Sequence, residues 1–423
     1  MQYNVIVKSP PKSNLSAQLP VAFGALTYII CGVVVSVIAS TSLSAEDYVN
    51  FVAFTSIGGI VVLGVGSAVE QETNLVFFRC SGRSLATLRF MAPRALWLIA
   101  ILWIAVLTPI ASWQTRLFGN QASVVQASVV LGAPGLLLAG VSRGIANGRG
   151  EFRQLGTAHL IFGLSSLLFP LGLWGCGVSL IAALIVGQSM AWATPSLILF
   201  RRKEFFAPHE KAIESTAKHL SGWLVLANMA LLSNLLSSQL IFRLASATLP
   251  ANVIAEAQVL ITVSCFASTL TLGLMPQIIA NRRRQLLSID KRETLVFTGL
   301  LTVGLLLPFM AAVFRRIISV VLLPRESTLG FLDALLITSP AFLLVATLLM
   351  SGQLIAAEKV RLVALLWICG LGGLWGISSI FGGDSLRSLS LALFIGALVA
   401  PAVFLLSRLP IIKVQSEKNN RFL

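Results

Sequence analysis

Charged residues are scarce in this chain of 423 residues: only 11% are Asp, Glu, Lys or Arg, and only three residues are histidine. A water-soluble domain carries about 25% charged residues. Because 56% of the residues are hydrophobic, the polar side chains cannot cover the surface of a water-soluble globule. The composition therefore excludes a soluble enzyme and predicts that lipid surrounds much of the folded chain.

Motifs for catalysis, metals and cofactors are also missing. The sequence contains no Walker A loop, no GxSxG turn, no paired acidic metal motif and no HExxH. Its five cysteines are scattered without a CxxC pair, and most lie within apolar runs, so we interpret them as small apolar residues. We therefore expect no enzyme activity, no metal and no cofactor.

Long apolar runs dominate what is present. A helix needs about 20 mostly apolar residues to cross a bilayer. Runs of this length predict an all-α integral membrane protein with about 12 transmembrane helices. The expected spans are roughly 20–42, 48–69, 95–112, 124–141, 156–174, 178–200, 221–243, 253–278, 294–314, 330–355, 362–381 and 388–407.

The basic residues between these runs indicate the orientation of the chain. The net charge of +15 comes from short blocks rather than from a basic face with interleaved aromatics, so we expect no nucleic-acid partner. With the N-terminus inside, 25 of the 31 Lys and Arg residues lie on the cytoplasmic side and 6 on the outer side. No cleavable signal peptide is visible. We therefore predict a multi-pass protein of the cell inner membrane with both termini in the cytoplasm.

The charged connector after the sixth expected span divides the chain into similar halves. Ala45-Glu46 opens the second span and Ala255-Glu256 opens the eighth, an offset of 210 residues. By this match we expect Glu256 at the membrane interface. Parallel repeats of this kind recur in transporters, with the substrate path between the halves. The predicted organisation is a lobe at 1–200, a cytoplasmic connector at 201–218, a second lobe at 219–412 and a cytoplasmic tail at 413–423.

Acidic residues at the inner end of the second span are the first candidates for function. Glu70 and Glu72 point about 200° apart around a helix, whereas Glu70 and Asn74 share a face. A carboxylate at the membrane edge normally faces protein or water. In one interpretation, Glu70 stands at the inner mouth of a substrate path, where it pairs with an arginine or takes part in ion coupling. In the other, it forms a structural ion pair with Arg143 or Arg149 of the next cytoplasmic loop. The candidates here are Glu70, Glu72, Asn74 and Arg79.

The glycine- and arginine-rich stretch 142–153 follows the fourth span. Its glycines allow a tight inner turn, and its arginines Arg143, Arg149 and Arg153 can hold a phosphate through bidentate hydrogen bonds. The alternative is an ordinary positive-inside loop. In the second half, Asn234 and Gln239 are polar candidates on different helix faces, so at most one of them lines a path.

Two smaller expectations concern the outer side and the cavity. Asp333 is expected to form an outer ion pair with Arg325 in the preceding loop. The middle of the spans is nearly free of arginine, although proteins that flip lipid-linked diphosphates often have a cationic cavity. Direct binding of a diphosphate inside the cavity is therefore not indicated by these residues.

The stretch Glu70-Gln71-Glu72, together with Arg143–Arg153, resembles bacterial polysaccharide flippases of the multidrug/oligosaccharidyl-lipid/polysaccharide exporter superfamily. The resemblance spans most of the chain, and its sharp motifs lie within 45–155. It implies two six-helix lobes around a central cavity. It further implies alternating-access translocation of a polyprenyl-(di)phosphate-linked glycan, with membrane lipids and a polysaccharide polymerase as partners.

Three alternatives stay open. The first is a cation-coupled small-molecule exporter of the same superfamily, which a mid-helix carboxylate in the first lobe would favour. The second is a lipid II flippase, which usually has fourteen helices and several cavity arginines. The third is a membrane-bound glycan polymerase or ligase, which would need a large outer loop with catalytic Arg or His.

Overall fold

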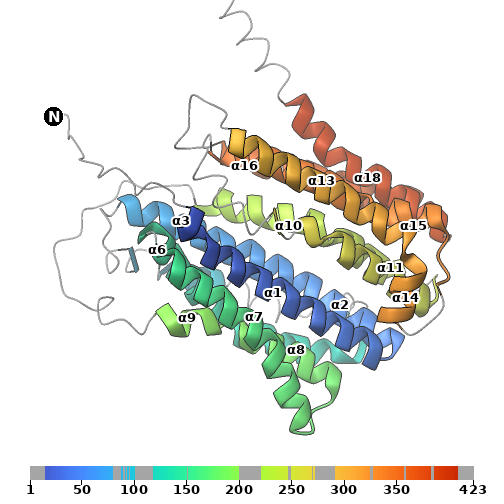
Figure 1. Cartoon of the computed structure of the whole chain (residues 1–423), viewed down its shortest axis with the longest axis horizontal. Helices are drawn as coiled ribbons and strands as arrows, with labels where there is room; N and C mark the ends of the chain where they lie inside the picture. The colour runs from blue at the N-terminus through green and yellow to red at the C-terminus, as the bar shows by residue number, and fades with distance from the viewer. Residues whose placement is uncertain are drawn as a thin grey trace, which may run out of the picture.

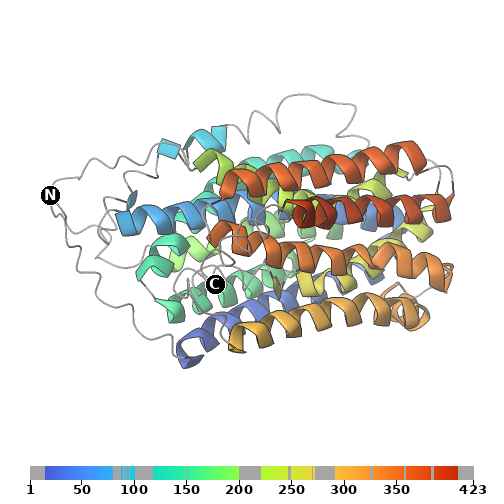
Figure 2. The same cartoon turned by 90° about the horizontal axis from the view of Figure 1, so that it is seen from above.

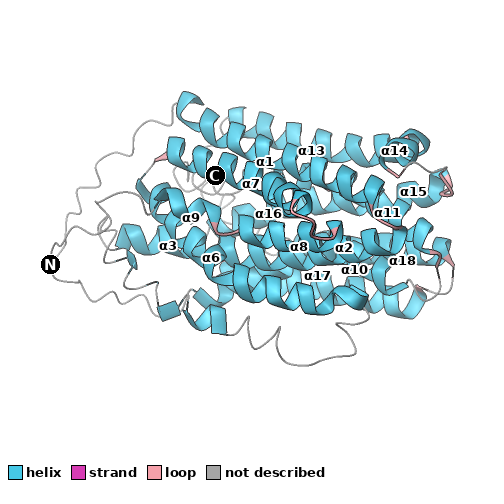
Figure 3. Cartoon of the chain, turned by 90° about the horizontal axis from the view of Figure 1, so that it is seen from below, coloured by secondary structure: helices cyan, strands magenta, loops and turns pink. Residues whose placement is uncertain are grey.

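The computed structural model describes most of the chain and places nearly all of the described residues in helices. The described ranges contain no strand, and short loops link the helices (Figure 3). These ranges are 15–79, 118–149, 151–199, 221–245, 249–268, 291–323, 327–356, 359–382 and 385–407, with isolated positions within 87–100 and at 270–271.

The helices of the first half begin with α1 and a long second helix that is interrupted by a π-helical segment. Ser44 caps the second helix, because its hydroxyl accepts a hydrogen bond of 3.1 Å from the backbone N–H of Asp47. The elements are α1 (Leu15–Ser42), α2 (Ala45–Gly59), the π-helix η1 (Ile60–Val65), α3 (Gly66–Arg79), the 3₁₀ turn η2 (Gly119–Gln121), α6 (Ala122–Arg149), α7 (Phe152–Gly175), α8 (Leu180–Ala191) and α9 (Thr194–Leu199).

The second half again consists largely of long apolar helices. Its elements are α10 (Ser221–Leu244), α11 (Ala251–Ser264), α13 (Lys291–Val313), α14 (Arg315–Leu322), α15 (Phe331–Thr338), α16 (Pro340–Ala356), α17 (Val360–Phe381) and α18 (Leu386–Leu406).

The expected membrane spans correspond to these helices, with differences in detail. In the described part of the chain, 8 helices are long and apolar enough to cross a membrane, or 9 if a pair bent by 76° counts as one span. This number is below the predicted twelve for three reasons. Most of the expected span 95–112 lies outside the described residues, 178–200 divides into α8 and α9, and the second span is split by η1.

The bend follows α13 and was not predicted. We expected a helix over 294–314 followed by a loop, but the chain turns through 76° at Phe314 and forms the short helix α14. The expected span 330–355 is confirmed as one apolar span, Phe331–Ile355, although it divides into α15 and α16 at Ser339, before Pro340. Pro340 lacks a backbone N–H, so it begins the second helix at little cost.

Helices of each half pack mainly on one another, and the two bundles lie side by side (Figures 1 and 2). We call α1–α9 the first lobe and α10–α18 the second lobe. Figure 1 shows the first lobe in blue and green below the second lobe in yellow to red. The lobes meet where α2, η1 and α3 contact α10, and where α2 contacts α11.

Three glycines of α6 let it pack closely against α3, which corrects our prediction of a turn over 142–153. A Cβ added at Gly144 would lie 2.5 Å from the carbonyl oxygen of Glu70, and one at Gly140 would lie 2.9 Å from that of Gly66. A Cβ at Gly148 would overlap the ring of Phe77. The spacing of four residues places these glycines on one helix face, as in small-residue packing motifs of membrane helices. The helix therefore continues to Arg149, and the arginine at 143 lies on a helix rather than in a loop.

We expect Gly144→Val to destabilise the first lobe, because the added side chain forces α3 and α6 apart. Overpacking of this kind costs about 1–3 kcal/mol. The midpoint of thermal unfolding of the purified protein in detergent would fall accordingly. The matched control is Gly172→Val, since a Cβ at Gly172 has nothing within 4 Å. Equal midpoints for the two variants would contradict the close-packing account.

Candidate functional site

A cavity of about 260 Å³ lies between the two lobes. Four long helices supply most of its wall: α1 and α2 from the first lobe, and α10 and α11 from the second. Residues of α7 and α8 complete it. None of the lining residues is charged. The cavity is therefore an uncharged chamber at the junction between the lobes, on the side where α2 meets α10 and α11.

Aromatic side chains form much of the wall. Phe54 of α2 and Trp192, which follows α8, stack with ring centres 6.4 Å apart, and Tyr28 of α1 stacks on Phe162 of α7 at 4.8 Å. Such stacked pairs add about 0.5–1.5 kcal/mol beyond the buried area and fix the orientation of the rings. The aromatic residues of the lining are Tyr28, Tyr48, Phe51, Phe54, Phe162, Trp192 and Phe266.

Polar groups in the wall are amides and hydroxyls. Gln239 of α10 accepts a hydrogen bond of 3.0 Å from the hydroxyl of Ser56 in α2, and its own amide donates to Thr262 of α11 at 3.2 Å. Gln188 of α8 also lines the cavity, although its amide donates to the backbone oxygen of Ser166. The lining can therefore offer neutral hydrogen bonds to a ligand.

Of the two polar candidates predicted on α10, Gln239 lines this cavity, whereas Asn234 does not. The amide of Asn234 donates to the carbonyl oxygens of Ala230 and Trp367, at 2.8 and 2.9 Å. It is thus a buried link between α10 and α17 inside the second lobe. Its amide satisfies a backbone carbonyl of the neighbouring helix, which lipid could not do.

Glu70 pairs with Arg143 inside the first lobe. The Nε of Arg143 lies 3.0 Å from Oε2 of Glu70, and the two side chains are 9% and 15% exposed. The N–H of this nitrogen is not aligned for a hydrogen bond, so the contact is an ion pair held by charge. The structure thus shows Glu70 beside Arg143, an arrangement that both interpretations of Glu70 allow. Neither residue lines the cavity between the lobes.

The other candidates of this segment face different surroundings. Glu72 is buried and lies 2.9 Å from Nη1 of Arg94, so the two carboxylates have separate partners, as their angular separation requires. The side-chain oxygen of Asn74 is buried without a hydrogen-bond partner. Arg79 ends α3, and its side chain lies outside the described residues.

The arginines at the junction of α6 and α7 are spread apart. Arg149 lies 3.6 Å from Glu151, and Arg153 is exposed in the first turn of α7. Arg143, six residues before Arg149, is buried against α3. The described residues therefore do not form a single phosphate-binding loop, which was one of the two interpretations of this stretch, because the helix continues to Arg149 and separates the arginines.

Polar contacts join the lobes at two further levels. Near the start of α2 and the end of α10, Arg243 of α10 donates through Nε and Nη2 to the side-chain oxygen of Asn50 in α2, at 3.1 and 2.8 Å. Toward the other end, the amide of Asn228 in α10 lies 3.5 Å from the side-chain oxygen of Gln71 in α3. The lobes therefore touch on both sides of the cavity.

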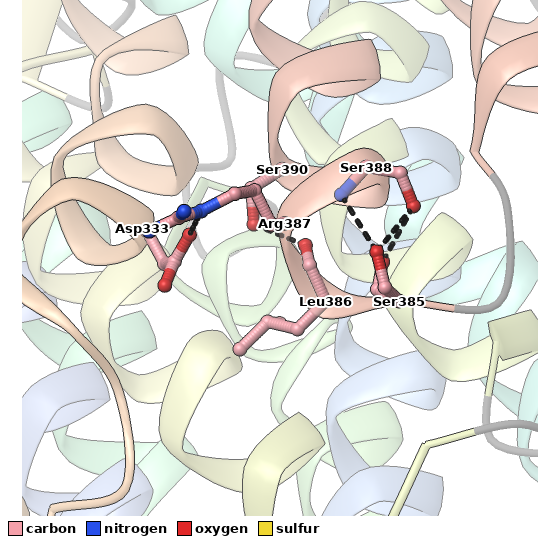
Figure 4. A network of polar contacts seen from close by, with 6 residues as sticks. All are labelled: Asp333, Ser385, Leu386, Arg387, Ser388 and Ser390. Carbon is pink, nitrogen blue, oxygen red and sulfur yellow. Dashed lines mark hydrogen bonds and ion pairs between the residues drawn. The ribbon is translucent and has the colours of Figure 1, made fainter.

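Asp333 has a different partner from the one we expected. Figure 4 shows the Arg387 side chain of α18 reaching Asp333 of α15, with Nε 3.4 Å from Oδ1. Arg387 is 70% exposed, so the pair contributes little energy. Arg325, the predicted partner, lies outside the described residues. In the described part of the chain, no three His, Cys, Asp or Glu side chains gather as a metal site would require.

The aromatic lining was missed by the sequence analysis, and so was the contact between Arg243 and Asn50. Aromatic residues in an apolar run look the same whether they face lipid, core or a cavity. A signal was available for the polar contact, because Asn50 and Arg243 are polar residues near the ends of two apolar spans.

Comparisons with known proteins identify the fold. No family model matches the sequence, and no curated protein matches it closely. Solved structures do match. A multidrug resistance MATE family transporter of the MOP superfamily in its inward-facing conformation has a TM-score of 0.66 at 15% identity, covering 93% of this chain and 99% of that chain. An outward-facing conformation scores 0.65 at 15% identity, covering 94% of each chain.

A Vibrio cholerae MATE transporter also matches, with a TM-score of 0.62 at 14% identity, covering 94% of this chain and 96% of that chain. The chain therefore has the two-lobed fold of MATE transporters of the MOP superfamily, which is the superfamily that the sequence resembles. The neighbours are transporters rather than enzymes. Inward-facing and outward-facing structures match about equally, so the likeness favours neither conformation.

We expect the pairing of Glu70 and Arg143 to appear in a double-mutant cycle. Removing one partner of a buried ion pair leaves an uncompensated charge and costs about 3–5 kcal/mol. Glu70→Ala and Arg143→Ala should each lower the unfolding free energy strongly, whereas the double variant should lose less than the sum. Unfolding in detergent measures the three variants. Strictly additive losses would show that the two charges do not interact.

Proposed function

We propose that this chain is a membrane exporter that moves an amphipathic small molecule across the inner membrane by alternating access of its two lobes. The observation that supports this most directly is the uncharged, aromatic-lined cavity at the lobe junction. The MATE fold supports the exporter class, because its solved relatives are described as multidrug resistance transporters. This proposal selects the small-molecule alternative over the lipid-linked glycan.

The absence of charge in the lining is the first argument. A diphosphate group carried into an uncharged chamber loses its hydration without gaining a cation, which is costly in an apolar environment. The buried Arg143 is already neutralised by Glu70 and lies outside the lining. A substrate without strong negative charge is therefore the better match for this cavity.

The aromatic wall is the second argument. Ring faces attract organic cations by about 0.5–2 kcal/mol and pack against flat apolar groups. The amides of Gln188 and Gln239 add neutral hydrogen-bonding groups that help to orient a bound molecule. The class of substrate proposed is accordingly a lipophilic molecule with an aromatic or cationic part.

Glu70 is the proposed coupling residue. Its carboxylate is held beside Arg143 at the junction of α3 and α6, and a proton arriving on Glu70 would remove the attraction between them. Since α3 continues the helix that carries cavity residues such as Phe54 and Ser56, a shift of α3 reaches the chamber along one helix.

A lipid-linked glycan flippase is the second candidate. The combination of aromatic faces and glutamine amides also suits the flat face and the hydroxyl groups of a sugar ring, and the motif resemblance points to that family. In this version the sugars would occupy the chamber, with a polyprenyl chain in the bilayer. The cytoplasmic arginines would then meet the phosphate before the glycan enters.

Transport assays separate the two candidates. Purified protein in liposomes with an imposed proton gradient should drive saturable transport of a fluorescent lipophilic cation such as ethidium. The companion measurement is the amount of polyprenyl-linked glycan in the inner leaflet of spheroplasts from a deletion strain. Ethidium transport with normal glycan levels supports the small-molecule exporter. Accumulated glycan without ethidium transport would overturn it in favour of the flippase.

We expect Trp192→Ala to lower the transport rate at subsaturating substrate by roughly 3- to 30-fold, the range given by the loss of one aromatic contact. Trp192 is 5% exposed and lines the cavity. Trp174→Ala is the matched control, since Trp174 is 49% exposed at the end of α7, outside the lining. If the two variants transport equally well, the cavity is not the substrate site.

We expect Glu70→Gln to impair transport while the amount of protein in the membrane stays the same. The amide keeps the shape of the side chain and still accepts a hydrogen bond, but it can no longer gain and lose a proton. The control is Glu151→Gln, because Glu151 is a carboxylate beside Arg149 at the end of α6, with Nη1 of Arg149 3.6 Å from Oε1 of Glu151. Unchanged transport by Glu70→Gln would reduce the pair to a structural role.

A further inference from the structure

Glu256 is a buried carboxylate that the proposed transport cycle does not yet use. It belongs to the second turn of α11 and is 3% exposed, although we expected a residue at the membrane interface. Its counterpart in the first half, Glu46, is exposed in the first turn of α2. The two halves therefore differ at this matched position, and the burial of Glu256 needs its own explanation.

In the described part of the chain, the hydrogen-bond donors to the Glu256 carboxylate all lie within residues 319–328, after the bend. One carboxylate oxygen accepts hydrogen bonds from the hydroxyl of Ser319 at 3.0 Å and from the hydroxyl of Ser327. The other accepts from the backbone N–H and the hydroxyl of Thr328, both at 2.8 Å. A single side chain thus ties the helix α14 and the loop after it to α11.

The helix α14 bridges the two lobes. It contacts α11 and α13 of its own lobe and also α1 of the first lobe. Figure 1 shows it at the end of the bundle, beside α11 and α15. Since α1 and α11 both line the cavity, α14 lies across the outer ends of two cavity walls that belong to different lobes.

The surface of α14 agrees with this placement. Ile318 and Leu322 pack into the core together with the buried Ser319, while Ile317, Val320 and Val321 are 55–62% exposed. At its start, Arg315 donates to the carbonyl oxygen of Leu329 at 2.8 Å, which holds the loop after α14 against the bend. The helix is therefore fixed at its start by Arg315 and along its inner face by Glu256.

We propose that Glu256 is a positioning residue for an outer gate, in which α14 closes the outer ends of α1 and α11 and moves with α11 when the lobes separate. This inference rests on the proposed alternating-access function. Glu256 itself touches no substrate. Its role is to keep α14 attached to α11. When the lobes separate, the contact between α14 and α1 then breaks, and the contact between α14 and α11 stays.

The hydrogen-bonding groups around Glu256 predict which substitutions keep α14 attached to α11. The backbone N–H of Thr328 can only donate, so it needs an acceptor, whereas the hydroxyls of Ser319 and Ser327 can turn and accept. A glutamine can therefore place its oxygen toward Thr328 and its amide toward the two serines. An alanine leaves all of these groups without a partner. Glu256→Gln should hold α14 in place, and Glu256→Ala should release it.

Pulsed electron spin resonance between α1 and α14 measures the gate directly. Nitroxide labels are introduced by Thr41→Cys and Val320→Cys, both at exposed positions, after the five native cysteines are replaced by alanine. In nanodiscs, the unmodified chain and Glu256→Gln should give one narrow distance distribution. Glu256→Ala should broaden it by roughly 2-fold or more, because a segment without its polar ties samples more positions. The matched control is Glu46→Ala, which should leave the distribution unchanged.

The outcomes are separable from those of the transport proposal. An unchanged distribution in Glu256→Ala, or one equally broadened in Glu46→Ala, overturns the inference. If Glu256→Ala does not fold, the double variant S319A/S327A takes its place. It removes two of the three hydroxyl donors, so the distance distribution should be broader than in the unmodified chain but by less than the 2-fold expected for Glu256→Ala. The distance measurement requires no substrate, so it stands even if ethidium transport fails. Where transport is measured, Glu256→Ala should slow it and Glu256→Gln should restore it; equal rates in both would overturn the gating role.

Discussion

The constraint that governs this molecule is that a polar group inside an apolar helix bundle must find its partner within the protein, because hydrocarbon offers none. Three carboxylates obey it in different ways. Glu70 has the charge of Arg143, Glu72 has Arg94, and Glu256 has the hydroxyls and the N–H of residues 319–328. Each of these contacts ties two specific segments together. The first pair joins α3 to α6 within one lobe, and Glu256 joins α14 to α11 within the other.

The cavity between the lobes, by contrast, has no charged residue in its lining. Its polar atoms are neutral and its walls are rich in aromatic rings, so a guest is held by shape, dispersion and a few hydrogen bonds rather than by charge. Weak and exchangeable contacts of this kind suit a transporter, which must release what it binds. Two of the contacts between the lobes also lack a carboxylate: the guanidinium of Arg243 donates to the amide oxygen of Asn50, and Ser56 donates to Gln239. Neither contact is an ion pair.

The sequence anticipated the kind of molecule and several of its polar residues. Apolar runs predicted the helices, and the angular separation of Glu70 and Glu72 predicted that the two carboxylates would have different surroundings. The prediction of a turn over 142–153 was wrong, because glycine serves both turns and close helix packing. Only the approach of α3 shows that Gly140, Gly144 and Gly148 have the second role. The spacing of four residues was the available signal, since it repeats once per helical turn.

Taken by itself, the sequence determined that lipid surrounds the chain, that the chain is helical and that it divides into two halves. These properties depend on local hydrophobicity and on the order of apolar and charged segments. Tertiary structure alone decided which residues meet. The aromatic lining comes from segments as far apart in the chain as Tyr28 and Phe266, and the burial of Glu256 depends on a 76° bend more than fifty residues later. Periodicity places a side chain on a helix face, but the partner of that face is set by packing between distant segments. For that reason the matched residues Glu46 and Glu256 look alike in the sequence and differ in the folded protein.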